Sequence, residues 1–243
     1  MSEKTPGTAI VSWKDKMLAV QKQSVEAEKP VGGFISFKGG RMTYNEMPIP
    51  GDKLLCVVVD YVLENTYFAS KYDPDKPLSP VCYAFGRKEK GMAPHEESED
   101  PQSDFCEGCP QNEWGSAGEG SKGKACKNSR RLAILHADFA TSPDKIHEGD
   151  LVFAKLPVTS VKNFSAFVNQ VSVLNLPPFG VICEMSVKPD NKTLFQVNFK
   201  AIKPIEGDDL LAALVAKNEL AAQKLIQTYP KNEEEAKPKS GKY

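Results

Sequence analysis

Four cysteines enclose a long part of this chain that shows no hydrophobic period. Cys82, Cys106, Cys109 and Cys126 bracket a polar, glycine-rich stretch. A segment without apolar residues at helix or strand spacing buries too little surface to offset the conformational entropy that it loses on ordering. We therefore expect a cross-link or a bound ion to hold this stretch. Thiolates are the ligands that Zn2+ prefers in structural sites, where four of them surround the ion as a tetrahedron.

The spacing of the cysteines favours zinc. Cys106 and Cys109 are separated by two residues, which lets both thiolates turn toward one ion, and Gly108 permits the positive backbone angle that such a turn often needs. Cys82 upstream and Cys126 downstream supply the remaining ligands. A site closed by four cysteines has no open coordination position, so the predicted zinc ion is structural and not catalytic.

Zinc held by all four cysteines has several alternatives. Disulfide frameworks are typical of short secreted chains, whereas six cysteines are spread here over 243 residues and the polar N-terminus lacks a signal-peptide pattern. This favours an intracellular, reducing compartment. His95 could replace Cys82 as a ligand. Two further alternatives remain. Cys106 and Cys109 could be a redox pair, although such pairs normally lie at the start of a helix that follows a strand, or the cysteines could hold no metal at all.

The composition indicates one soluble domain, or one domain with an insertion. The chain has 243 residues, of which 40% are hydrophobic, and no segment is apolar for long enough to cross a membrane. Its formal net charge of -1 excludes a uniformly basic surface, so a nucleic-acid site would have to be a local patch. The sequence has no phosphate loop, nucleophile elbow or His-Glu-x-x-His motif, and we expect no enzyme activity.

Hydrophobic periodicity predicts many short strands and a few helices. The predicted elements before residue 80 are a helix at 12–28 within an arm of residues 1–30, a hairpin of strands 34–38 and 41–44, a valine-rich strand at 54–63, and a short strand at 67–69 that pairs back onto it. Those after residue 128 are strands at 130–136 and 151–156, a helix at 161–173, a hairpin of strands 181–187 and 194–202, and a helix at 208–228 within the segment 206–230. Residues 231–243 have the composition of a disordered tail.

These elements predict a mainly β fold of the α+β class. Three hairpins and flanking helices favour an OB-like antiparallel barrel over residues 31–205, with a zinc-knuckle insertion at about residues 80–128. An OB barrel leaves one curved face open to an oligomer. A β-sandwich with a ribbon insertion is the competing prediction. Cys56 and Cys183 lie inside apolar strands and are expected to be small buried residues.

A cationic, glycine-rich loop follows the cysteine pair. Five cations lie between Trp114 and Leu132 with only Glu119 opposing them, and glycines let the backbone approach a phosphate chain closely. An aromatic ring beside such a loop can stack on an unpaired base. The predicted nucleic-acid-binding residues are Trp114, Lys122, Lys124, Lys127, Arg130 and Arg131 around this loop, and Phe34, Phe37, Lys38, Arg41, Tyr44 and Tyr83 elsewhere. The competing interpretation is a solvated loop, with aromatic residues that fill the core.

Several short segments around the cysteines resemble a known family. They are Pro80-Val81-Cys82-Tyr83, Cys106-Glu107-Gly108-Cys109-Pro110, Asn112-Glu113-Trp114-Gly115-Ser116 and the run from Gly123 to Leu132. Together they are similar to the zinc-bearing, OB-fold single-stranded DNA-binding proteins of bacteriophages. The resemblance implies that the chain binds single-stranded DNA and takes part in phage DNA replication or recombination. It also implies replication or recombination proteins as possible partners, and a location in the cytoplasm of an infected bacterium. The better-known members use one histidine with three cysteines and end in an acidic tail, whereas Glu233 to Glu235 are followed here by lysines.

The leading hypothesis is a non-enzymatic protein that binds single-stranded DNA without sequence preference. The alternative is a zinc-stabilised interaction module, in which the knuckle and the acidic loop from Glu96 to Asp104 bind a replication or transcription protein of the host or phage. A third, weaker hypothesis is an accessory factor of a nuclease or recombinase. Retention on single-stranded DNA resin, against co-purification of a protein partner, distinguishes the first two.

Overall fold

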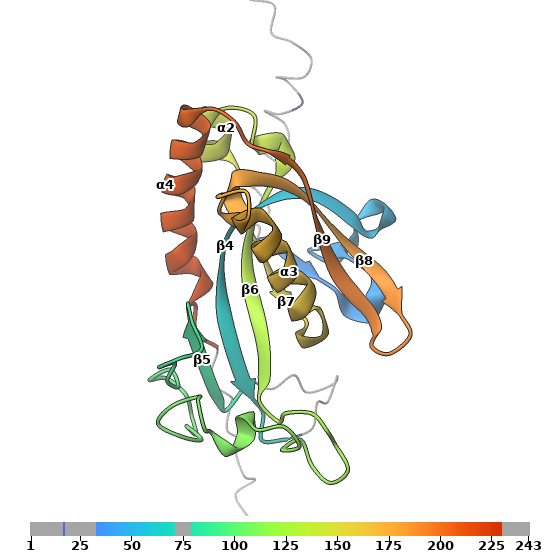
Figure 1. The fold of residues 1–243 in the computed structure, drawn as a ribbon, viewed down its shortest axis with the longest axis vertical. Helices are drawn as coiled ribbons and strands as arrows, with labels where there is room; N and C mark the ends of the chain where they lie inside the picture. Colours follow the sequence, from blue (N-terminus) through green and yellow to red (C-terminus); the bar gives the residue numbers. More distant parts are fainter. Residues whose placement is uncertain (1–16, 18–32, 71–78, 230–243) are drawn as a thin grey trace, which may run out of the picture.

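The computed structural model describes Met17, residues 33–70 and residues 79–229. The predicted helix at residues 12–28, except for Met17, and the predicted tail at residues 231–243 lie outside this part. The described fold is mainly β, with one mixed sheet and a few helices (Figure 1). Within the described ranges, no helix combines the length and the apolar character that crossing a bilayer requires.

Strands account for most of the regular structure. In the described part the strands are β1 at Phe34–Ser36, β2 at Thr43–Tyr44, β3 at Met47–Pro48, β4 at Lys53–Tyr67, β5 at Cys82–Gly86, β6 at Lys127–His136, β7 at Val152–Leu156, β8 at Val181–Asp190 and β9 at Leu194–Pro204. The α-helices are α2 at Pro143–Glu148, α3 at Val161–Ser172 and α4 at Asp208–Leu225. Two of the short 3-10 turns matter below, η1 at Lys38–Gly40 and η3 at Pro110–Asn112.

The strands form one curled sheet that stays open, a half-barrel. Its order is β3-β2-β1-β7-β6-β4-β8-β9, and β5 pairs with β4 beside this path. The prediction of a wholly antiparallel barrel is wrong in one pairing, because β1 runs parallel to β7. Parallel neighbours need a long crossover, here the whole chain from β2 to β6, and hairpin signals in a sequence do not reveal such a pairing.

β4 is the central strand, and both of its faces are buried. It pairs with β6 along one edge, and on the other edge first with β8 and then with β5. α3 covers one face of the sheet with Phe164 and Phe167, whereas α4 covers the opposite face with Leu214 and Leu225. Burial on both sides explains why residues 54–63 form an almost unbroken apolar run instead of an alternating one.

Most predicted elements are confirmed within a few residues, including both long hairpin strands β8 and β9 and helix α3. The prediction that residues 67–69 pair back onto β4 is wrong, since Tyr67 ends β4 and the partner there is β5. α4 ends at Leu225, three residues before the predicted end, and Arg131 donates to the carbonyls of Leu225 and Gln227 at this point. Cys56 and Cys183 are buried as predicted, opposite each other on β4 and β8 with sulfur atoms 3.7 Å apart.

Candidate metal centre

The far end of β4 brings two of the four predicted ligands together. Tyr67 of β4 pairs with Cys82, the first residue of β5, while the neighbouring Thr66 pairs with Lys127, the first residue of β6. Cys126 immediately precedes Lys127. The register of three strands therefore fixes the backbone positions of two cysteines that are far apart in the sequence.

A tight turn carries the other two cysteines. Gly108 adopts a φ of 76°, in the left-handed region that glycine reaches without strain. Asn112 closes the turn, since its side-chain amide donates to the carbonyl of Cys106 and its backbone N–H donates to the carbonyl of Cys109, both at 2.8 Å. The carbonyl that precedes Asn112 accepts the N–H of Cys126 at 2.8 Å. This last bond ties the turn to the start of β6.

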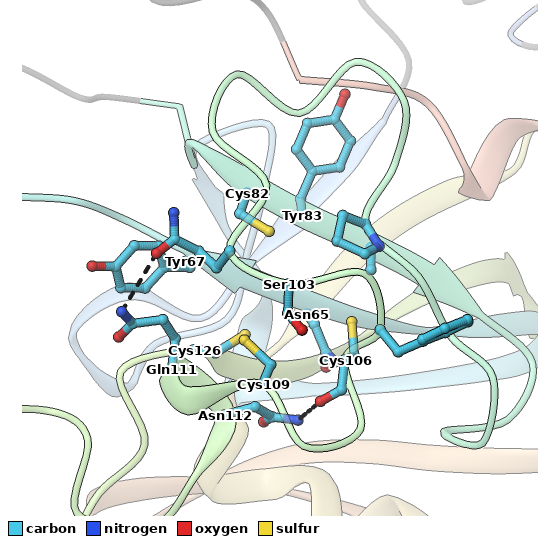
Figure 2. Close-up of a pocket in the computed structure, with 14 residues that line it drawn as sticks. Asn65, Tyr67, Cys82, Tyr83, Ser103, Cys106, Cys109, Gln111, Asn112 and Cys126 are labelled. Atoms are coloured by element: carbon cyan, nitrogen blue, oxygen red, sulfur yellow. Dashed lines mark hydrogen bonds between the residues drawn. The ribbon is translucent and has the colours of Figure 1, made fainter.

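All four cysteines line one pocket (Figure 2). The cavity has a volume of about 20 Å³, room for about one water-sized sphere. The six cysteines, all within the described residues, are free thiols. Among the described residues, no three His, Cys, Asp or Glu side chains already stand where they could hold a metal ion, so ion binding would need the thiols to turn inward. The donor set and the size of the cavity fit a thiolate-preferring ion such as Zn2+.

Burial and mutual proximity raise the pKa values of these thiols. Burial, followed by the charges of Cys106, Cys82 and Cys109, raises the pKa of Cys126 to about 12. Burial is also the main reason why the pKa values of Cys82 and Cys106 lie above the ordinary 9.0. A cation would relieve the repulsion between their thiolates, and its binding would release their protons.

The alternative ligand and the redox interpretation fit this pocket less well. His95 is not among the residues that line it; its ring stacks on Tyr83 with 5.2 Å between centroids, and its Nδ1 accepts the N–H of Glu97. Cys109 is followed only by the short turn η3, whereas a redox pair normally opens an α-helix. His95 therefore lies outside the pocket that the four cysteines line.

A loop with an exposed tryptophan leads away from the pocket. We call residues 113–125 the tryptophan loop. The N–H of Gly115 donates to the carbonyl of Gly123 at 2.9 Å, which closes the loop at its base. Trp114 is 78% exposed, and the ammonium group of Lys124 lies 5.3 Å from the centroid of its ring. A large apolar ring is thus held in water, with a cation beside it.

The predicted cations of this region divide into two kinds. Lys122 and Lys127 are exposed, and Lys124 and Arg130 are half-buried along the loop and the start of β6. The side chain of Arg131 is only 18% exposed, and its Nε contacts a carboxylate of β4 at 2.7 Å. Arg131 therefore lies inside the fold, where a phosphate would have to displace its present partner.

The other predicted nucleic-acid-binding residues also divide by burial. Phe34, Lys38 and Arg41 are exposed, whereas Phe37, Tyr44 and Tyr83 pack wholly or partly in the interior. Arg41 is paired with Asp52 at 2.9 Å. β7 separates the β1–β2 hairpin from β6 in the sheet, so the exposed hairpin residues and the tryptophan loop are two separate groups.

Sequence reasoning missed a charged cluster under the end of α4. Glu64 of β4 is fully buried, and its carboxylate accepts from Arg131 Nε at 2.7 Å, from Lys155 Nζ at 2.9 Å and from the Tyr229 hydroxyl at 2.5 Å. We call these four residues the Glu64 cluster. The available signal was an acidic residue directly after the apolar run at 54–63, because a charge that close to a buried strand needs partners.

The Glu64 cluster makes stability depend on pH. Burial acts to raise the pKa of the Glu64 carboxyl, but the charges of Lys155 and Arg131 outweigh it, and the pKa lies below the ordinary 4.5. A carboxyl with a lowered folded pKa contributes stability that is complete above its unfolded pKa and is lost as pH falls through the folded one. We expect the free energy of unfolding to decline below pH 4.5, and to decline less steeply in Glu64→Gln. Urea titrations of both proteins at several pH values measure this, and parallel curves would contradict it.

No protein-family model, curated protein or solved structure matches this chain. Its function is therefore inferred from the chemistry of the site itself, which combines a four-thiol pocket, an exposed aromatic ring and a group of cations.

Proposed function

We propose that this protein binds single-stranded DNA without sequence preference, through the tryptophan loop and the start of β6, beside a structural zinc ion held by the four cysteines. The observation that carries the proposal is Trp114, which is 78% exposed on a loop closed by backbone hydrogen bonds. An unpaired base can stack on such a ring, while the neighbouring Lys124 meets the phosphate chain.

Zinc would prepare the tryptophan loop for binding. Cys109 directly precedes η3 and Cys126 directly precedes β6, so an ion bound to both fixes the two ends of the segment that carries the loop. A loop held in its bound shape loses less conformational entropy when it meets DNA. Four cysteines fill the coordination shell, which gives the ion a structural role.

Tolerance of sequence follows from the kinds of contact. Lys122, Lys127 and Arg130 offer charge to phosphates, and stacking on a ring accepts any base. For a single strand, each neutralised phosphate contributes a slope of about -0.7 to log K against log salt concentration, so affinity falls steeply with salt. The curled, open sheet supports the proposal of an OB-like fold. The proposal also includes a part in phage DNA replication or recombination, in the cytoplasm of the bacterial host.

Replacing Trp114 by alanine should weaken binding to a labelled oligothymidine by about 5- to 150-fold, since stacking of a base on an aromatic ring is worth about 1–3 kcal/mol. The slope against salt should stay unchanged, because no charge is removed. Fluorescence anisotropy at two salt concentrations measures both quantities. Leu220→Ala is the matched control, because Leu220 is a 46% exposed apolar residue on α4, and its loss should leave affinity unchanged.

Lys124→Gln completes the test, because it should reduce the salt slope that Trp114→Ala leaves alone. The proposal fails if the protein does not bind single-stranded DNA at low salt, or binds it no better than duplex DNA. Co-purification of a protein partner in that case would support the interaction module with its acidic loop.

A further inference from the structure

The turn between β8 and β9 displays an exposed leucine in a strained backbone conformation. Leu194 has a φ of 67° and is 86% exposed. Residues other than glycine and asparagine seldom adopt this left-handed conformation, because the Cβ atom crowds the following carbonyl. At 86% exposure the leucine gains little packing that would offset the strain. Folding alone therefore does not explain a leucine at this position.

Hydrogen bonds within the turn hold Leu194 in this conformation. Asp190 pairs with Leu194 across the hairpin, and its Oδ1 accepts from the N–H of Lys192 at 3.0 Å and from the N–H and hydroxyl of Thr193 at 2.8 Å each. These bonds fix the loop and occupy the carboxylate. Figure 1 shows the turn standing free at the edge of the sheet. The leucine is thus presented on a rigid support.

Two exposed lysines flank the turn, with Asp190 between them in the sequence. Lys188 and Lys192 are exposed on either side of it. η1 packs against the same hairpin, since a Cβ atom on Gly40 would lie 3.4 Å from Cβ of Phe195, and the exposed Lys38 is the first residue of η1. An apolar side chain with cations around it complements a nucleic-acid strand, which offers apolar base faces along a chain of negative charge.

We propose that the β8–β9 turn is a second polynucleotide contact, in which Leu194 inserts against a base while Lys38, Lys188 and Lys192 contact neighbouring phosphates. The inference rests on the proposed function and adds a site to it. A second copy of the chain is the poorer occupant, because its lysines would repel an identical surface.

Leu194→Asn tests the proposal, because asparagine adopts the left-handed conformation at lower cost than leucine. The variant should melt at the wild-type temperature or about 2–4 °C higher. Its affinity for a labelled oligothymidine should fall about tenfold, the worth of burying a leucine side chain, with no change in the salt slope. Leu194→Met keeps an apolar side chain of similar reach and should restore most of the affinity.

The outcomes separate this inference from the proposed function. Failure of the wild-type protein to bind would end both, whereas wild-type binding that Leu194→Asn leaves unchanged would end this inference alone. A lower melting temperature in Leu194→Asn would show that the leucine stabilises the fold, against the argument from strain. Equally weak binding by Leu194→Met would show that the contact is not apolar. Altered sedimentation with unchanged DNA affinity would assign the turn to self-association instead.

Discussion

Removal of zinc is expected to unfold the segment between β5 and β6 while the half-barrel stays folded. The small core that this segment shares with β4 and β5 consists of Leu63, Ala84 and Met92. Structural zinc contributes about 10–16 kcal/mol in small zinc domains, more than so small a core can replace. With a strong chelator, the backbone amides of Cys106 and Cys126 should lose protection from hydrogen exchange, as measured by mass spectrometry, and each chain should release one zinc ion.

Single substitutions give this prediction its control. Cys126→Ser should reproduce the effect of the chelator and lower DNA affinity, because Cys126 joins the pocket to β6. Cys183→Ala removes a buried cysteine from β8 in the main core, and should lower global stability while one zinc ion per chain is retained. Natively purified protein without a transition metal, or with unchanged exchange in the chelator, would remove zinc from the proposal.

Glu64→Gln is expected to destabilise the whole protein by about 3–5 kcal/mol, because it leaves the cations of Arg131 and Lys155 without their buried partner. Glutamine preserves the shape of the side chain, so the loss reports charge. The chain after α4 should open first, since Arg131 binds its carbonyls and Tyr229 donates to Glu64. Urea unfolding measures the free energy, and hydrogen exchange locates the opening.

A surface ion pair provides the comparison for this variant. Glu184 of β8 lies 3.5 Å from Lys53, whose side chain is 58% exposed, and such pairs contribute about 0–1 kcal/mol. Glu184→Gln should therefore change the free energy of unfolding little. If the two variants lose equal stability, the burial of Glu64 does not determine the size of the loss.

The sequence predicts the local features of the site well, because they depend on short-range rules. The spacing of Cys106 and Cys109 around Gly108 predicts a turn with a positive backbone angle, which the structure contains. The exposure of Trp114 follows from its place in a glycine-rich segment without apolar neighbours. The β8–β9 hairpin follows from two apolar runs on either side of a turn that begins at Asp190.

What the sequence does not predict depends on contacts between distant segments. Glu64 acquires partners from β6, from β7 and from the residues after α4, and each of these placements needs the complete fold. Arg131 is predicted as a phosphate contact because it stands in a run of cations. Strand alternation instead turns it toward the α4 face of the sheet, while Arg130 points to the other face. The backbone angle of Leu194 likewise has no signal in a sequence that places leucine where glycine is usual.

Cys56 and Cys183 lie in the main core, apart from the four cysteines that line the pocket. Both of these residues have 0% exposure, and the hydrogen bond to Cys183, together with burial, raises the pKa of Cys56 well above 9.0. An alkylating reagent applied to the folded chain therefore meets first the half-buried sulfur atoms of Cys82 and Cys106, because Cys109 and Cys126 are also buried. Its rate of reaction with the unaltered protein reports how fully those atoms are occupied.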